Sequence, residues 1–227
     1  MEILIVSKTH MSSAACVGGL VLSNNRYVRL LNIGNYNQPT DTEFEVGDVY
    51  DINFIDRTTL HPPHIEDVII TSKTFLRKII DMPALLRQKS VIDWNGHINN
   101  LFGEILSWTN SGTGYIPFNG QMPVKSVGFW IADKDLIKVS FDNNKVRYRY
   151  PNGANYRNIS YVGYQNSIEI IPAGTILRVS LSRIFPSENS GITTPRGYYL
   201  QLSGWYSEVD KTTTQKVELP PEITKWL

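Results

Sequence analysis

Cations and aromatic residues alternate in one short segment of the chain, which is the sequence pattern with the clearest potential chemistry. In the run KVRYRY, Lys145, Arg147 and Arg149 occupy every second position, and Tyr156 and Arg157 follow closely. Proteins that bind single strands use cations to follow the backbone and rings to stack on bases. We therefore predict a nucleic-acid-binding site made of Lys145, Arg147, Arg149, Tyr156 and Arg157.

The same alternation has a purely structural interpretation. On a strand, successive side chains point to opposite faces. The three cations of the run would then share one face, and Val146, Tyr148 and Tyr150 would share the other. In this alternative the tyrosines enter a core and the cations form a solvated face.

A second group of cations lies near the N-terminus. Lys8, His10, Arg26 and Arg29 surround the first expected hairpin, and Cys16 lies between them in sequence. They predict an anion-accepting pocket at the mouth of a barrel. The alternative is that Cys16 is a small buried apolar residue and Lys8 an ordinary charge at a strand end.

No complete catalytic, metal or cofactor motif is present in the sequence. His61 and His64 are separated by two prolines that force an extended chain, so we expect no metal site there. The glycines at 112 and 114 lack the strand and helix of a nucleotide-binding fingerprint, so no cofactor is predicted. A nucleophile pair of Cys16 with His10 or His97 is a weaker alternative without a visible third group.

Composition and charge restrict the function further. The chain has 227 residues and a net charge of +1, so no overall field draws it to a polyanion and any nucleic-acid site must be local. The single cysteine excludes an intramolecular disulfide and favours a reducing, cytoplasmic compartment. The apolar runs are too short to cross a bilayer, so we expect no membrane partner.

Apolar alternation predicts mostly strands in the first half of the chain. Strands are expected over 2–7, 16–22 and 27–31, with an Asn24-Asn25 turn joining the last two, and over 49–54 after Gly47. Helical spacing of apolar residues predicts helices over 72–81, from 83 onward and over 98–108.

The second half repeats the pattern of the first. After a linker at 111–123 rich in Gly, Ser and Thr, strands are expected over 127–132, 136–141, 145–150, 168–171, 175–181 and 198–205, with an asparagine turn at 142–144. Aligning Gly47 with Gly174 superposes two glycine-led strands. Each half then has the element order of a five-stranded Greek-key barrel.

This order predicts a mainly β protein with a few helices. Two OB-like Greek-key barrels are joined by a partly helical linker, with boundaries 1–110, 111–123 and 124–227. Tyr50, Ile52 and Phe54 are expected in one core, and Ile176, Val179 and Leu181 in the other.

Several strings of the chain resemble the bacterial dual OB-containing domain family. They are ILIVSKT at 3–9, CVGG at 16–19, RYVRL at 26–30, VGDV at 46–49, HIEDV at 64–68 and YYLQLSGWY at 198–206. The resemblance implies two OB barrels and a non-enzymatic module that binds single-stranded nucleic acid or a nucleotide. The alternative is a protein-interaction or regulatory subunit that uses an exposed aromatic segment at 198–206.

Overall fold

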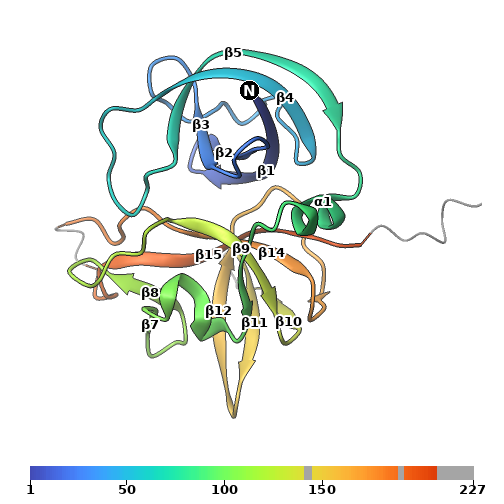
Figure 1. The fold of residues 1–227 in the computed structure, drawn as a ribbon. Coiled ribbons are helices and arrows are strands. Elements are labelled where there is room, and N and C mark those ends of the chain that lie inside the picture. The colour runs from blue at the N-terminus through green and yellow to red at the C-terminus, as the bar shows by residue number, and fades with distance from the viewer. Residues whose placement is uncertain (141–144, 189–191, 209–227) are drawn as a thin grey trace, which may run out of the picture.

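A closed five-stranded barrel forms the first unit of the computed structural model, which describes residues 1–140, 145–188 and 192–208 (Figure 1). Its strands are β1 (Glu2–Met11), β2 (Ala14–Val21), β3 (Tyr27–Leu31), β4 (Asp48–Asp56) and β5 (Asp67–Lys78). They pair in the order β1-β2-β3-β5-β4, with β3 and β5 parallel. The expected turn joins β2 to β3, and Asn25 adopts a φ of 61° there.

The strands of the second unit pair in an order equivalent to that of the first unit, within a larger sheet. Its strands are β6 (Ile92–Gly96), β7 (Ser107–Trp108), β8 (Gly114–Pro117), β9 (Val127–Ala132), β10 (Leu136–Ser140), β11 (Val146–Asn152), β12 (Asn155–Tyr161), β13 (Ile170–Ile171), β14 (Ile176–Leu181) and β15 (Gly197–Tyr206). Hydrogen bonding runs from β10 through β11, β12, β15 and β14 to β9, and β12 and β15 are parallel. Only residues 133–135 separate β9 from β10 along the chain, so these two strands together occupy the position that β1 has in the first unit.

The glycine-led strands occupy equivalent positions in the two units. Gly47 precedes β4 with a φ of +95°, and Gly174 precedes β14 with a φ of +82°. Both values lie in the left-handed region that glycine tolerates best. The predicted fold class of two OB-like Greek-key barrels is confirmed.

The helix predicted over 72–81 is wrong. Residues 67–78 form one long strand, β5, which pairs with β4 along its length, so Tyr50 lies opposite Phe75. Phe75 and Leu76 are exposed, which removes the apolar face on which the helix prediction rested. The next expected helix does form: α1 (Met82–Gln88) starts at Asp81, whose side chain accepts a hydrogen bond from the backbone N–H of Ala84.

The helix predicted over 98–108 is largely absent. A short 3-10 helix, η1 (Ile98–Gly103), is broken by non-helical backbone at Leu101 and Phe102, and Ser107–Trp108 forms β7. Phe102 and Glu104 have positive φ values, which an α-helix does not allow.

The region between the two barrels also contains strands. β8 pairs with β15, and β6 pairs in parallel with β9. The division into 1–110, 111–123 and 124–227 stays a prediction, and the asparagine turn at 142–144 lies outside the described residues.

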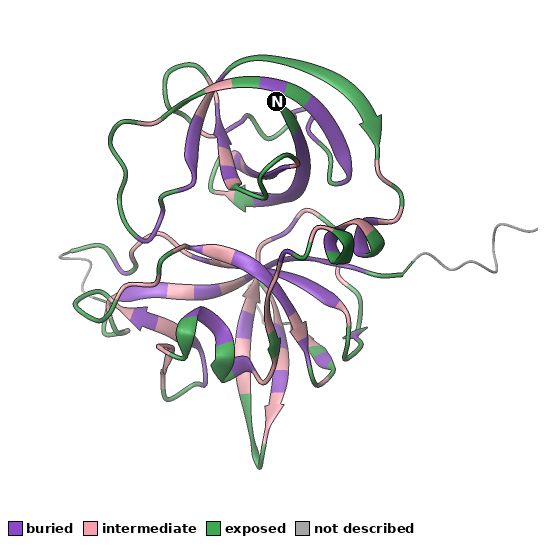
Figure 2. Cartoon of the chain, viewed as in Figure 1, coloured by how far each residue is buried: buried purple, intermediate pink, exposed green. Residues whose placement is uncertain are grey.

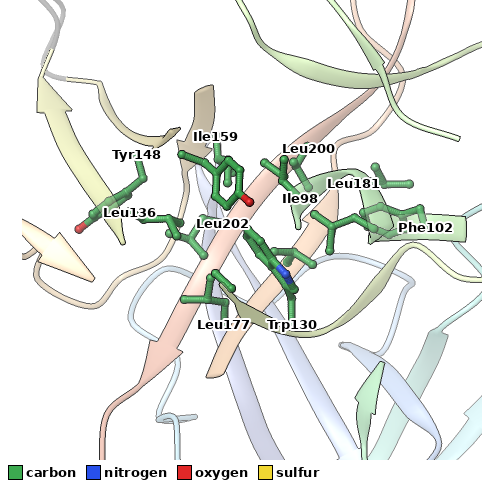
Figure 3. Close-up of a cluster of buried hydrophobic side chains, with 14 of the residues drawn as sticks. Ile98, Phe102, Trp130, Leu136, Tyr148, Ile159, Leu177, Leu181, Leu200 and Leu202 are labelled. Carbon is green, nitrogen blue, oxygen red and sulfur yellow. The ribbon is translucent and has the colours of Figure 1, made fainter. Parts of the chain in front are cut away.

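Each unit has its own apolar core, and a third cluster lies between them. Tyr50 and Ile52 are buried in the first core, with Phe54 packed against it, while Val179 and Leu181 are buried in the second. Figure 3 shows the second core, where side chains from several strands converge on Trp130.

The third cluster corrects the prediction for Ile176. This side chain packs with Leu4, Val49, Phe129 and Tyr206 between the units and belongs to neither barrel core. Buried residues line β1 and β9, where the two units approach each other (Figure 2). α1 adds Met82 and Leu86 to the same cluster. The two barrels therefore share an apolar interface.

Candidate binding cleft between the two units

A cleft of about 1080 Å³ lies between the two units. Its walls come from β1, β2 and β3 of the first unit and from β9, β11, β14 and β15 of the second, together with residues between 108 and 115, at 182–185 and at 193–195. Pockets for small ligands usually measure about 300 to 1,000 Å³. The cleft is therefore large enough for an extended polar ligand.

Polar contacts between the units help to fix the walls of the cleft. The backbone N–H of His10 donates to the carbonyl of Val162 over 2.8 Å. The buried Glu66 carboxylate accepts from the backbone N–H of Ser126 at 2.7 Å and from its hydroxyl at 2.8 Å. Because these groups are satisfied by partners in the other unit, opening the cleft would leave them unpaired.

Cations dominate the charge of the cleft. Five of them line it: Arg29, Lys145, Arg147, Arg178 and Arg183. Among the described lining residues, Glu66 is the one carboxylate that faces them. A cleft with an excess of one charge and low-dielectric walls concentrates counter-ions of the opposite charge. The arrangement favours an anionic ligand.

Three of the arginines near the cleft share one buried carboxylate. Arg29 donates to Asp67 through Nε at 2.5 Å and Nη2 at 2.6 Å. Arg57 reaches the same carboxylate at 3.0 Å, and Arg183 of the second unit reaches it at 3.4 Å. One negative charge does not neutralise three positive charges, so the cluster contributes net positive charge to the cleft wall.

Arg178 is the most buried cation of the cleft, with 2% of its surface exposed. Its guanidinium carbon lies 4.6 Å from the ring centre of Tyr27 and 4.9 Å from that of Phe129. Nε and Nη1 are buried and have no hydrogen-bond partner, and no ion pair among residues 1–140, 145–188 and 192–208 includes this side chain. A buried cation with neither kind of partner is costly to fold.

Aromatic rings line the cleft beside the cations. Tyr115 on β8 and Tyr199 on β15 stack with ring centres 5.5 Å apart and an angle of 21° between their planes. Phe185 packs edge-on against Tyr199 and is half-exposed, and Trp108 also lines the cleft. Exposed ring faces of this kind can stack on planar ligands.

The predicted nucleic-acid residues are divided between two hollows. Lys145 and Arg147 line the cleft, whereas Arg149, Tyr156 and Arg157 line a separate hollow of about 450 Å³. In that hollow Arg149 lies over the Tyr156 ring, at 5.5 Å from its centre.

The tyrosines of the alternating run lie in the core. Tyr148 and Tyr150 are fully buried there, as the structural interpretation of the pattern expected. The cations on the opposite face nevertheless reach the two hollows, so burial of the tyrosines and an accessible cation face occur together.

The predicted anion pocket of Lys8, His10, Arg26 and Arg29 is not assembled as one group. His10 and Arg29 line the cleft. Lys8 is buried elsewhere, where its Nζ donates to Glu45 at 2.7 Å and to a backbone carbonyl. Arg26 pairs with a surface aspartate on the far side of the first hairpin.

Cys16 and the histidines have structural surroundings. Cys16 lines the cleft, but burial raises the pKa of its thiol and disfavours the nucleophilic thiolate. His10 stacks on Tyr164 with ring centres 3.8 Å apart, and His97 lies 3.1 Å from an oxygen of Asn152. Burial lowers the pKa of His64, whose Nε2 lies 3.0 Å from the carbonyl of Ser182.

Metal and membrane features are not found in the described part of the chain. No group of three or more His, Cys, Asp or Glu side chains within it is placed to hold a metal ion. Its helices fall short of the length and apolar character that a membrane span requires.

The segment 198–206 is not an exposed aromatic surface. It forms most of β15, in which eight of the ten residues are buried, with Tyr199 and Gln201 partly accessible in the cleft. The alternative of a protein-interaction surface at this segment was based on its exposure, and that basis is wrong.

Sequence reasoning missed several residues of the cleft. Arg178, Arg183, Tyr115 and Phe185 line it although no motif singled them out, and the sequence assigned Tyr199 only to an interaction segment. One signal was present for Arg178, because it is a charged residue inside the otherwise apolar strand ILRVSL. The others come from loops and short strands whose positions depend on packing between the units.

Comparison with known proteins gives one match over most of the chain. A family model described as dual OB-containing domain matches residues 1–205. A search of curated proteins finds no match.

Two solved structures are similar at low identity. One is titled "Crystal structure of p204 HINb domain", with 10% identity, 89% of this chain and 95% of that chain covered, and a TM-score of 0.32. The other is titled "Structure of murine DNA binding protein bound with ds DNA", with 8% identity, coverages of 89% and 91%, and a TM-score of 0.29.

Proposed function

This chain belongs to the dual OB-containing domain family, and we propose that it binds a short stretch of single-stranded nucleic acid in the cleft between its two units. OB folds commonly bind oligonucleotides and oligosaccharides. Because a fold alone does not define a function, the proposal rests on the chemistry of the cleft.

The observation that carries the proposal is the meeting of cations and rings from both units in one cleft. Arg29 approaches from the first unit, and Lys145 and Arg147 from the second. Tyr115 and Tyr199 provide stacked rings in the same space. Cations that track the phosphates and rings that stack on bases are the two components of single-strand recognition.

The size and charge of the site favour a single strand over a duplex. The net charge of +1 gives the chain no overall field toward a polyanion, whereas five cations line the cleft. Duplex binding relies on many phosphate contacts over a broad surface. An enclosed cleft instead gives access to a few unpaired nucleotides with their bases exposed.

The first test is fluorescence anisotropy with short DNA and RNA oligomers at two salt concentrations. Arg147→Gln should weaken binding and lower the slope of log affinity against log salt by about 0.7, the value for one phosphate contact on a single strand. Arg77→Gln is the matched control, because Arg77 is exposed on β5 and pairs with Glu2 outside the cleft. Equal effects of the two changes would contradict the proposal.

The second test concerns stacking. Tyr199→Ala should cost about 1 to 3 kcal/mol of binding free energy if a base stacks on its ring. Tyr156→Ala removes an exposed ring from the separate hollow and serves as the control. If Tyr156 matters and Tyr199 does not, the strand follows the outer face of β11 and β12 and does not enter the cleft. If the wild-type chain binds no oligomer at low salt, the proposed function is wrong.

A further inference from the structure

We propose that the inner end of the cleft is a phosphate-monoester subsite centred on Arg178, which takes the phosphorylated end of a nucleic-acid strand or a mononucleotide. This inference deepens the proposed function and rests on it. It identifies which part of the ligand enters furthest and which group recognises it.

The first observation is the uncompensated charge of Arg178. The side chain is 98% buried, lines the cleft and has no partner for Nε or Nη1 in the described residues. The neighbouring arginines Arg29 and Arg183 differ, because both donate to Asp67. Unlike Arg29 and Arg183, Arg178 pairs with no carboxylate of the described residues, and a bound dianion would supply the missing charge.

The second observation is the close approach of the Ser7 hydroxyl to the backbone of Gly18, next to the guanidinium. Gly18 on β2 lies beside it, and a Cβ at Gly18 would collide with the hydroxyl of Ser7 and would lie 3.9 Å from Nη2 of Arg178. Gly18 has no positive φ, so its lack of a side chain is required for space and not for backbone conformation. The absence of a side chain at Gly18 leaves room for the Ser7 hydroxyl, which lines the cleft.

Hydroxyl groups line the same cleft as Arg178. Ser180 on β14 and Ser203 on β15 lie with their oxygens 2.8 Å apart, and both line the cleft together with Ser7. Hydroxyls donate to phosphate oxygens, and an arginine binds a phosphate through two parallel N–H groups. The combination of one arginine with several hydroxyls is suited to the oxygens of a single phosphate group.

The position of Arg178 favours a terminal phosphate over an internal one. Its guanidinium lies against the rings of Tyr27 and Phe129, and Phe129 belongs to the apolar cluster between the units. A strand cannot continue through that cluster, so a phosphodiester with nucleotides on both sides does not fit at this depth. A monoester projects from the end of a chain, carries a charge of about −1.5 to −2 and exposes three oxygens.

If Arg178 has a purely structural role, a different stability is expected for the Arg178→Met variant without ligand. If Arg178 only packs between Tyr27 and Phe129, Arg178→Met removes two cation–π contacts and destabilises the fold. If its charge is held for a ligand, Arg178→Met relieves an unpaired buried cation. Unfolding of the empty variant in urea should then occur at the same or a higher midpoint than in the wild type.

The binding experiment compares one short oligothymidylate with a 5′-phosphate, with a 3′-phosphate and with neither, together with thymidine monophosphate and thymidine. The wild type should bind at least one phosphorylated end roughly ten- to a hundred-fold more tightly than the unphosphorylated strand. Arg178→Met should abolish this preference, so that the variant binds the phosphorylated and the unphosphorylated strand with the same affinity. Arg77→Met is the matched control and should keep the preference.

The outcomes separate this inference from the proposed function. If all strands bind the wild type equally, the phosphate subsite is wrong and single-strand binding stands. If thymidine monophosphate raises the melting temperature of the wild type and no oligomer binds, the subsite stands for a mononucleotide and the strand proposal is wrong. If no strand and no nucleotide binds, both are wrong. The wild-type comparison needs no variant, so it decides the question even where Arg178→Met does not fold.

Discussion

Replacing Asp67 by Asn should destabilise the protein strongly, because this carboxylate is shared by arginines of both units. The Asp67 side chain is 3% exposed, and those of Arg29, Arg57 and Arg183 are 15%, 25% and 35% exposed. Removing one partner of a buried ion pair costs about 3 to 5 kcal/mol. The three arginines retain contact with water, so we expect the lower end, about 3 kcal/mol of unfolding free energy.

The measurement is urea unfolding followed by circular dichroism and by tryptophan fluorescence. Asp56→Asn is the control, because Asp56 pairs with Arg26 at the surface with side chains 65% and 40% exposed and should lose only about 0.2 to 1 kcal/mol. Coincident transitions by both probes would justify a single free energy for the two units. If the two variants lose the same amount, the shared carboxylate does not stabilise the contact between the units.

Two further predictions concern the interface between the units. Burial lowers the pKa of His64, so the unfolded chain binds a proton at a higher pH than the folded chain, and stability falls as the pH drops below about 6.5. The wild type should therefore lose more unfolding free energy between about pH 8 and pH 5 than the variant His64→Gln loses. Equal losses would show that His64 stays accessible to water. Phe129→Ala removes a fully buried ring that lies between Tyr27 and Tyr206, and it should cost about 3 to 5 kcal/mol of unfolding free energy. Phe54→Ala removes a part-buried ring and should cost less in the same denaturant titration.

The strand elements could be predicted where local pattern and turn chemistry agree. The hairpin at Asn25 and the strands that follow Gly47 and Gly174 are marked by residues that tolerate positive φ next to alternating apolar runs. These are local properties of the chain, so the sequence contains them.

The segment 72–81 shows where local pattern fails. Its apolar residues have helical spacing, but pairing with β4 supplies the backbone hydrogen bonds of a strand through residue 78, and Phe75 remains exposed. The competing interaction comes from residues 19 to 30 positions away in sequence. No window of local sequence contains that information.

The candidate site follows the same division. The alternation at 145–150 correctly identified a face of cations, and the sequence located Arg29 and His10 near a barrel mouth. It could not show that Lys145 and Arg147 line the same cleft as Arg29, or that Arg149 lines a different hollow. Nor could it show that the Lys8 side chain donates a hydrogen bond to Glu45. Each of these facts depends on contacts between residues distant in the chain, and the first depends on how the two barrels pack against each other.

By itself, the sequence determined the residue types available for binding, the strands that carry them and the family of the fold, because these depend on neighbouring residues and on side-chain periodicity. The tertiary structure decided which charges are compensated. Asp67 is surrounded by three arginines, while Arg178 is buried between two rings without a carboxylate. Burial and charge compensation arise from contacts between residues distant in the chain, and those contacts exist only after the two units have packed together.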